Sequence, residues 1–229
     1  MQRHNPFLER LRNGPLLCDG GMGTELYARG ISYERCFEHL NITDPELIKS
    51  IHLDYVAAGA QIIETNTFGA NRYRLAEHGL ENQVVEINRA GAKVAREVRE
   101  LSEQPIFLAG DIGPLGSPLA PIGTIQPADA RAAFVEQTEA LLQSGVDLLI
   151  IETMSDLAEM REALMAVRSV TDLPVVALMT FGEDGTIISG EDAHTVATTL
   201  RDLGRQRLWR QLRPGSRQHV RRGQKHVRL

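Results

Sequence analysis

Five short apolar runs, each of strand length, constrain the fold of this chain more than any other feature. They lie at residues 15–21, 60–68, 105–113, 146–154 and 173–181. Each run is continuously apolar and lacks the alternation that marks a strand with one face in water. Continuous apolar strands are typical of parallel sheets, which are covered on both faces.

The segments between these runs are predicted to be helices. They occupy residues 43–59, 81–101, 126–145, 155–170 and 191–204. Five strand–helix units in succession predict an α/β fold with a parallel sheet.

Capping residues support the helix predictions. Asp44 can cap the first predicted helix, Pro45 suits its first helical position and Gly59 ends it. Ser155 is expected to cap the fourth helix.

An acidic residue stands at the end of four predicted strands. These residues are Asp19, Glu64, Asp111 and Glu152. The C-terminal strand ends of such folds carry the chemistry, so four acids at one rim indicate a site there. The alternative is that the acids cap the helices that follow. We favour capping for Asp111 and function for Asp19 and Glu152.

The composition is that of a globular protein in a reducing compartment. Hydrophobic residues make up 42% of the chain, and no apolar run approaches the ~18–20 residues of a membrane helix. The N-terminus has no secretory h-region, so we expect a cytoplasmic location and no membrane partner. The two cysteines, Cys18 and Cys36, are too few for a zinc site of three or four thiolates.

Three segments together resemble the homocysteine S-methyltransferase family. They are "LLCDGGMGTEL", "HLNITDPELIKSIHLDYVAAGAQIIETNTFGANRYRL" and "GVDLLIIETM". The likeness runs from about Leu16 to Gly204. It is strongest to bacterial enzymes fused to a methylenetetrahydrofolate reductase, and to the N-terminal module of cobalamin-dependent methionine synthase.

The resemblance implies a (β/α)₈ TIM barrel, of which about five β–α units lie in residues 1–204. Such a partial barrel leaves its first and fifth strands as open edges. The implied activity is methyl transfer to the thiol of homocysteine, giving methionine. The donor is methyltetrahydrofolate, S-methylmethionine or S-adenosylmethionine.

The resemblance also implies a substrate site. Asp19 and Glu152 would hold the amino group of homocysteine, because a buried ammonium needs carboxylate partners. The backbone at Gly20 and Gly21 would lie close by. Two further polar residues are expected to line the pocket, Asn66 and Thr67.

The family's cofactor is a zinc ion on three cysteines, which deprotonates the substrate thiol. None of those cysteines is present here. Cys18 is expected to be a small buried hydrophobe, and the Cys36–x–x–His39 spacing is interpreted as incidental. Three other histidines are expected at or near the surface, His52, His78 and His194. The sequence therefore predicts no metal ligand and no catalytic residue in this chain, and negligible turnover.

The last 25 residues, 205–229, differ sharply from the rest. They carry nine of the 25 Lys+Arg and none of the 30 Asp+Glu, which leaves 16 − 30 = −14 for residues 1–204. By the resemblance, one zinc cysteine of the family lies in a Gly-x-Asn-Cys motif just after the sixth strand. The codon of Trp209 followed by permitted codons for residues 210–213 reads Gly-Ala-Asn-Cys one base later, so we expect a tail that is disordered or translated out of frame. The alternative is a basic arm for an acidic partner, with nucleic acid unlikely. Two other functions therefore stay open, a catalytically dead amino-acid- or thiol-binding fragment and an interaction protein that uses the tail.

Overall fold

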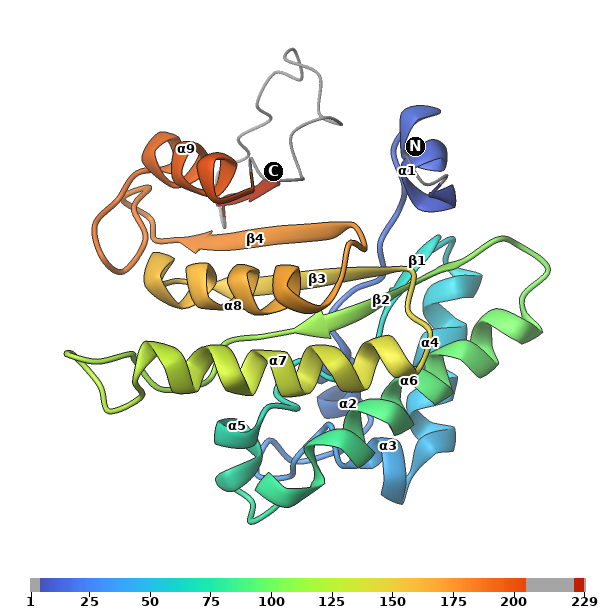
Figure 1. Ribbon diagram of the computed structural model, residues 1–229. Coiled ribbons are helices and arrows are strands. Elements are labelled where there is room, and N and C mark those ends of the chain that lie inside the picture. The colour runs from blue at the N-terminus through green and yellow to red at the C-terminus, as the bar shows by residue number, and fades with distance from the viewer. Residues whose placement is uncertain (1–4, 205–224, 229) are drawn as a thin grey trace.

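A computed structural model describes residues 5–204 and 225–228, and confirms an α/β fold with a parallel sheet (Figure 1). The sheet order is β1-β2-β3-β4-β5. Strands β1 (Ile62–Glu64), β2 (Phe107–Ile112), β3 (Leu148–Met154) and β4 (Val175–Phe181) pair in parallel. Four of the five predicted strands are thus confirmed within a few residues. The first, at 15–21, is reduced to one parallel bridge between Cys18 and Ile62.

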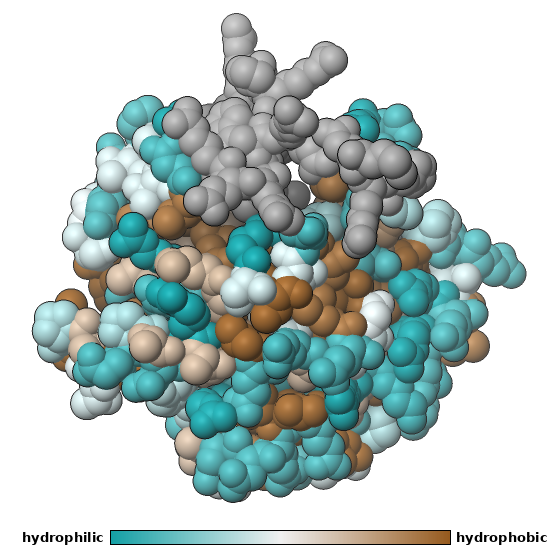
Figure 2. Space-filling model, viewed as in Figure 1, coloured by the Kyte–Doolittle hydropathy of each residue, from teal (hydrophilic) through white to brown (hydrophobic). Residues whose placement is uncertain are grey.

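The five predicted helices are all present. They are α4 (Pro45–Ala57), α6 (Val84–Leu101), α7 (Pro127–Gln143), α8 (Leu157–Val170) and α9 (Ala193–Gly204). These helices contact one another in chain order, and Figure 1 shows α6, α7 and α8 along one face of the sheet. On this helical side, Figure 2 shows a mostly polar surface with small apolar patches.

Four short helices were not predicted, α1 (Pro6–Arg12), α2 (Met22–Ala28), α3 (Leu40–Thr43) and α5 (Arg72–Ala76). The first three residues of the helix predicted at 81–101 form a 3₁₀ turn, η1 (Glu81–Gln83), which precedes α6. Helix α1 packs on the other face of the sheet, where Phe7 meets Phe107 edge to face at 5.4 Å between ring centroids.

The caps are partly as expected. Asp44 caps α4 by accepting a hydrogen bond from the Leu47 N–H, and Pro45 is the first helical residue. Ser155 does not cap α8. The cap is the next residue, Asp156, whose Oδ1 accepts from the Ala158 N–H at 2.7 Å.

The edge beyond β4 is not open, contrary to expectation. Strand β5 (Lys225–Arg228) pairs antiparallel with β4, with Leu178 opposite Arg228. The predictions for the rest of the tail concern residues 205–224 and 229, which lie outside the described residues. In the described part of the chain, no helix has both the length and the apolar character to cross a membrane.

Side-chain alternation divides the core into two layers. Leu149, Ile151 and Val175 face the helices, in a cluster with Phe134 and Val167. Neighbouring strand positions face the other way, and there Ile62, Ala109, Leu148 and Ile150 form a second cluster with Phe7. This second layer is the inner face of the sheet, and its strand residues lead toward the acidic rim.

Candidate functional site: an acidic rim on the inner face

Three of the predicted acids follow directly from the inner-face alternation. Glu64 is two residues after Ile62, Asp111 is two after Ala109, and Glu152 is two after Ile150. Since side chains two apart share a face, all three carboxylates lie at the C-terminal rim above the inner layer. One oxygen from each lies within 4.8 Å of the others. The predicted convergence of strand-end acids is therefore present.

Asp19 also lies at this rim, in the segment between the Cys18–Ile62 bridge and α2. Its N–H donates to the Ile62 carbonyl at 3.0 Å, and its Oδ2 accepts from the Glu64 N–H at 3.0 Å. Burial raises the pKa of Asp19 from 3.8 to about 7, against the opposing effect of that hydrogen bond. A cationic ligand would offset this loss of solvation.

Asp111 is the most enclosed of the four acids, with 5% of its surface exposed. Its backbone is fixed by two threonines, because its N–H donates to Thr65 Oγ1 and its carbonyl accepts from Thr67 Oγ1. Its Oδ1 has no hydrogen-bond partner among the described residues. Burial, and then the nearby carboxylates of Glu152 and Glu64, raise the pKa of Asp111 well above its usual range.

The capping role favoured for Asp111 is wrong. The helix that follows it, α7, begins at Pro127 and has Gln126 as its N-cap residue. No side chain makes a capping hydrogen bond at the start of α7 among the described residues, so Asp111 does not cap it. It belongs to the rim.

Glu152 lies at an irregularity in strand β3. The register between β3 and β4 shifts between Ile151 and Met154, and Thr153 has a φ of 57°. A positive φ is a genuine outlier for a β-branched residue, and bulges of this kind redirect side chains beside sites.

Cys18 is not the buried hydrophobe that we expected. It is half-buried at the rim, and its thiol donates to Glu64 Oε1 at 3.2 Å and to Asp19 Oδ1 at 3.5 Å. Burial, and then the charges of these two acids, raise its pKa far above the usual range of a thiol. The sulfur therefore stays protonated.

The two glycines of the predicted site lie where α2 begins. A Cβ added at Gly20 would meet the Tyr55 ring at 3.0 Å, and the Tyr55 hydroxyl donates to the Gly21 carbonyl at 3.2 Å. Gly21 is the N-cap residue of α2. The close contact with Tyr55 explains why a residue without a side chain stands beside Asp19.

Asn66 and Thr67 are buried, and their polar groups bond within the chain. Asn66 Nδ2 donates to the Phe37 carbonyl at 2.8 Å and to Asn41 Oδ1 at 3.0 Å. Thr67 Oγ1 bonds to Asp111 and to Thr65. These contacts hold the chain that carries the rim. A direct role in a substrate pocket stays a prediction for both residues.

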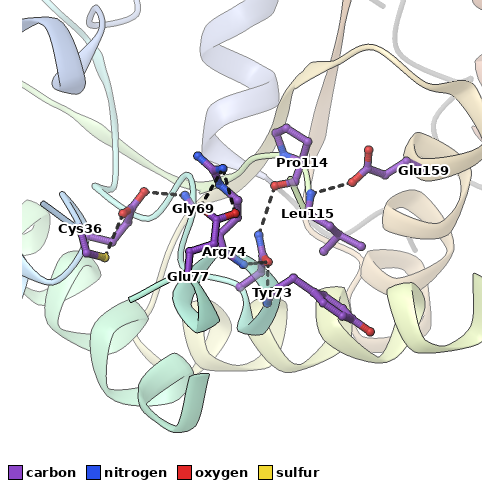
Figure 3. Close-up of polar contacts among 10 residues, drawn as sticks. Cys36, Gly69, Tyr73, Arg74, Glu77, Pro114, Leu115 and Glu159 are labelled. Carbon is purple, nitrogen blue, oxygen red and sulfur yellow. Dashed lines mark hydrogen bonds and ion pairs between the residues drawn. The ribbon is translucent and has the colours of Figure 1, made fainter. Parts of the chain in front are cut away.

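The loops above the rim are held by further carboxylate and amide contacts, some of which are drawn in Figure 3. The Gly69 N–H donates to Glu38 Oε1 at 2.7 Å, and the Leu115 N–H donates to Glu159 Oε1 at 2.6 Å. Asn71 caps α5 and donates from Nδ2 to the Pro114 carbonyl at 3.3 Å. The loops after β1 and β2 are thus linked to each other and to α8.

Candidate metal ligands gather only at the rim, as far as the described residues go. One group is Cys18, Asp19 and Glu64, and the other is Glu64, Asp111 and Glu152. Cys36 belongs to neither group, since its thiol donates to Glu38 Oε2 at 3.4 Å. The interpretation of its spacing to His39 as incidental agrees with this arrangement.

Of the three histidines expected near the surface, two are exposed, His78 and His194. The third expectation is wrong. His52 has no exposed surface, and neither ring nitrogen has a hydrogen-bond partner in the described part of the chain. Its helix α4 contacts α3, α6 and β1, so it is covered on more than one side.

The family model for homocysteine S-methyltransferase matches residues 16–210. The chain belongs to this family. The matched range covers Asp19 and all three strand-end acids, and it ends a few residues beyond the boundary that we drew at Gly204.

Two curated relatives are methionine synthases. The chain is 30% identical to that of Mycobacterium tuberculosis over 86% of its own length, and 28% identical to that of Mycobacterium leprae over its whole length. It spans only 18% and 20% of these relatives.

Solved structures give the same assignment. The metallated form of the homocysteine methyltransferase MmuM from Escherichia coli matches with a TM-score of 0.76 and 27% identity, over 87% of this chain and 75% of MmuM. The oxidized form matches with a TM-score of 0.75 and 28% identity, over 86% and 73%. The resemblance inferred from the motifs is therefore confirmed.

Proposed function

We propose that this chain is the homocysteine-binding part of a homocysteine S-methyltransferase, with the acidic rim as the seat of the substrate's amino group. The observation that carries the proposal is the convergence of Asp19 and Glu152 at one rim of a family member. By family likeness, the complete catalytic unit would be a (β/α)₈ barrel and the cell compartment the cytoplasm.

The chemistry of the rim suits an amino-acid ligand with a protonated amino group. Asp19 is largely desolvated, and the charge of Glu152 raises its pKa further. An ammonium ion placed between two such carboxylates makes charge-assisted hydrogen bonds, and it stabilises their ionised forms. The glycine backbone at residues 20–21 stands beside Asp19, where the rest of the substrate would lie, and the Gly21 carbonyl is already bonded to the Tyr55 hydroxyl.

A zinc ion held by three thiolates does not fit the residues of this chain. The whole sequence has two cysteines, and both thiols donate hydrogen bonds to carboxylates instead of converging. Cys18 is held as a thiol, whereas zinc needs a thiolate. We therefore propose that the 229-residue chain binds homocysteine without appreciable methyl transfer, and we assign it no methyl donor.

Calorimetry with the full chain tests this proposal. L-homocysteine should bind, and 4-mercaptobutanoate, which lacks only the amino group, should bind at least about tenfold more weakly because it loses charge-assisted hydrogen bonds. Asp19→Asn and Glu152→Gln should each weaken homocysteine binding by a similar factor. The control is Glu183→Gln in the exposed loop after β4.

Equal binding of the two ligands would show that the rim does not recognise the amino group. If neither ligand binds, the proposed function is refuted. A methionine-forming assay on the same sample tests the second part. Turnover by the pure chain would show that thiol activation does not need the three-thiolate centre.

A further inference from the structure

We propose that Glu64, Asp111 and Glu152 form a binding site for a hard divalent cation, of the Mg²⁺, Mn²⁺ or Ca²⁺ class. The site would use carboxylate oxygens only. Its ligand chemistry would differ from that of a zinc centre built on cysteines.

The spacing of the three carboxylates suits a single ion. One oxygen from each residue lies within 4.8 Å of the other two. Two ligands of one ion are at most twice the metal–oxygen distance apart, about 4.2 Å for Mg²⁺ and about 4.6–5.2 Å for Ca²⁺. Small side-chain adjustments would thus bring all three oxygens onto one ion without a change in the sheet.

Two of the three ligands come from paired strand positions. Glu64 and Asp111 lie at the ends of adjacent strands, and their registers are fixed by the pairs Glu64–Ala109 and Asp111–Ile150. Glu152 lies on the next strand, in the stretch of β3 where the register shifts. The backbone of Asp111 is further fixed by Thr65 and Thr67. A site on paired strands keeps its geometry when empty, which favours binding.

Asp111 gives an independent indication of a ligand. Its side chain is more than nine-tenths buried, and Oδ1 has no hydrogen-bond partner among residues 5–204 and 225–228. A buried carboxylate oxygen without a partner is costly, and in proteins such groups are paired or coordinate metals. The nearest acidic groups repel it, so the ionised carboxylate needs a bound cation, or else the carboxyl must take up a proton.

The donor set selects the class of ion. Carboxylate oxygens suit Mg²⁺, Ca²⁺ and Mn²⁺, whereas thiolates select softer ions. The sulfur of Cys18 is bonded to Glu64 as a thiol donor and lies outside this group of three. Asp19 also lies outside it and stays available to an ammonium group, whereas Glu152 would be shared between the two sites.

Titration of the metal-free full chain with Mn²⁺ tests the site in the absence of homocysteine. Electron paramagnetic resonance and calorimetry should both give one bound Mn²⁺ per chain, displaced by Mg²⁺ or Ca²⁺. Asp111→Asn should weaken binding at least about tenfold, which is the loss that even outer partners of metal ligands cause. Glu64→Gln is the second variant and should have the same effect.

The matched control is Glu159→Gln. Glu159 is also buried and acidic, but its Oε1 accepts from the Leu115 N–H, and it lies outside the group of three. This variant should bind Mn²⁺ as the unchanged chain does. Mn²⁺ should also raise the melting temperature of the unchanged chain and of Glu159→Gln, but not that of Asp111→Asn or Glu64→Gln.

The proposal is overturned if no saturable Mn²⁺ binding occurs up to about 1 mM, the weak end of protein calcium sites. It is equally overturned if Asp111→Asn and Glu64→Gln bind Mn²⁺ as the unchanged chain does. Because no homocysteine is present, failure here leaves the proposed function untouched. Failure of homocysteine binding likewise leaves this site untouched.

Discussion

Asp19 and Glu64 are joined by a hydrogen bond of 3.0 Å, which the backbone N–H of Glu64 donates to the Asp19 carboxylate. This bond ties the segment before α2 to the end of β1. Among the described residues, the ladder between these two segments consists of the single bridge of Cys18 and Ile62. Asp19 therefore has a structural role that can be separated from any role in binding.

Two substitutions of Asp19 make that separation. Asparagine keeps an oxygen that can accept from the Glu64 N–H, and alanine leaves that donor unpaired. Both remove the charge, so Asp19→Ala should be less stable than Asp19→Asn by about 1–3 kcal/mol. Urea unfolding of the two variants gives this difference. Equal stability would mean that the bond contributes nothing, while homocysteine binding should be weak in both.

Asp111→Asn should stabilise the metal-free chain. The Asp111 side chain is buried beside two other carboxylates, with one oxygen that nothing in the described structure pairs. An asparagine of the same shape has no charge, and its amide can donate to a neighbouring carboxylate. We expect a gain of about 1–3 kcal/mol in the free energy of unfolding at neutral pH in the presence of a chelator. A loss of stability would show that Asp111 is compensated in the folded chain.

His52 should make the stability of the chain sensitive to mild acid. Burial lowers its pKa from 6.5 to about 4, so at pH 5 the unfolded chain takes up a proton that the folded chain excludes. Stability due to this residue is therefore lost as the pH falls from about 6.5 toward 4. At pH 5 the loss is about 2 kcal/mol.

His52→Leu, of similar volume, should remove this effect. The variant should be more stable than the unchanged chain at pH 7.5, because it removes two buried ring nitrogens that have no hydrogen-bond partner in the described part of the chain. Its advantage should grow by about 2 kcal/mol at pH 5. Unfolding in urea at the two pH values measures both differences. The exposed position His78 supplies the control, and His78→Gln should leave the pH dependence unchanged. An advantage that does not depend on pH would contradict the assignment.

The periodic elements were predictable because their apolar patterns are long. Continuous apolar faces are buried by β1 to β4, and striped ones by α4 and α6 to α9. Phe134 of α7 and Leu149 of β3, for example, belong to the same core cluster. Helices α2, α3 and α5 span two turns or less and depend on tertiary contacts. For α5 a local signal did exist, since Asn71 caps it by accepting from the N–H groups of Tyr73 and Arg74.

The errors at the site have physical causes. The interpretation of Asp111 as a cap assumed a short connection to the next helix, although Pro127 already marked a later helix start. His52 was misplaced because a single apolar stripe was assumed for α4, which in fact packs against β1 and two helices. The hydrogen-bonded thiol of Cys18 depends on Glu64, 46 residues away, and no local pattern reports such a contact.

Thr153, the residue after Glu152, has a backbone conformation that costs energy. Its φ of 57° is in the left-handed region, which costs an L-residue roughly 1–2 kcal/mol and which asparagine adopts more readily than threonine. The side chain is exposed, so its replacement leaves no cavity. Thr153→Asn should therefore raise the free energy of unfolding by about 1 kcal/mol.

Because asparagine favours the same backbone conformation, the bulge that presents Glu152 should survive in Thr153→Asn, and homocysteine affinity should stay within about twofold. Thr153→Val is the control, since it keeps the β-branch and removes the hydroxyl, which donates to Glu152 Oε2 at 3.4 Å. It should gain no stability. If Thr153→Asn is not stabilised, the positive φ is not costly at this position. If Thr153→Val alone loses affinity, it is the hydroxyl, and not the bend in β3, that holds Glu152 in place.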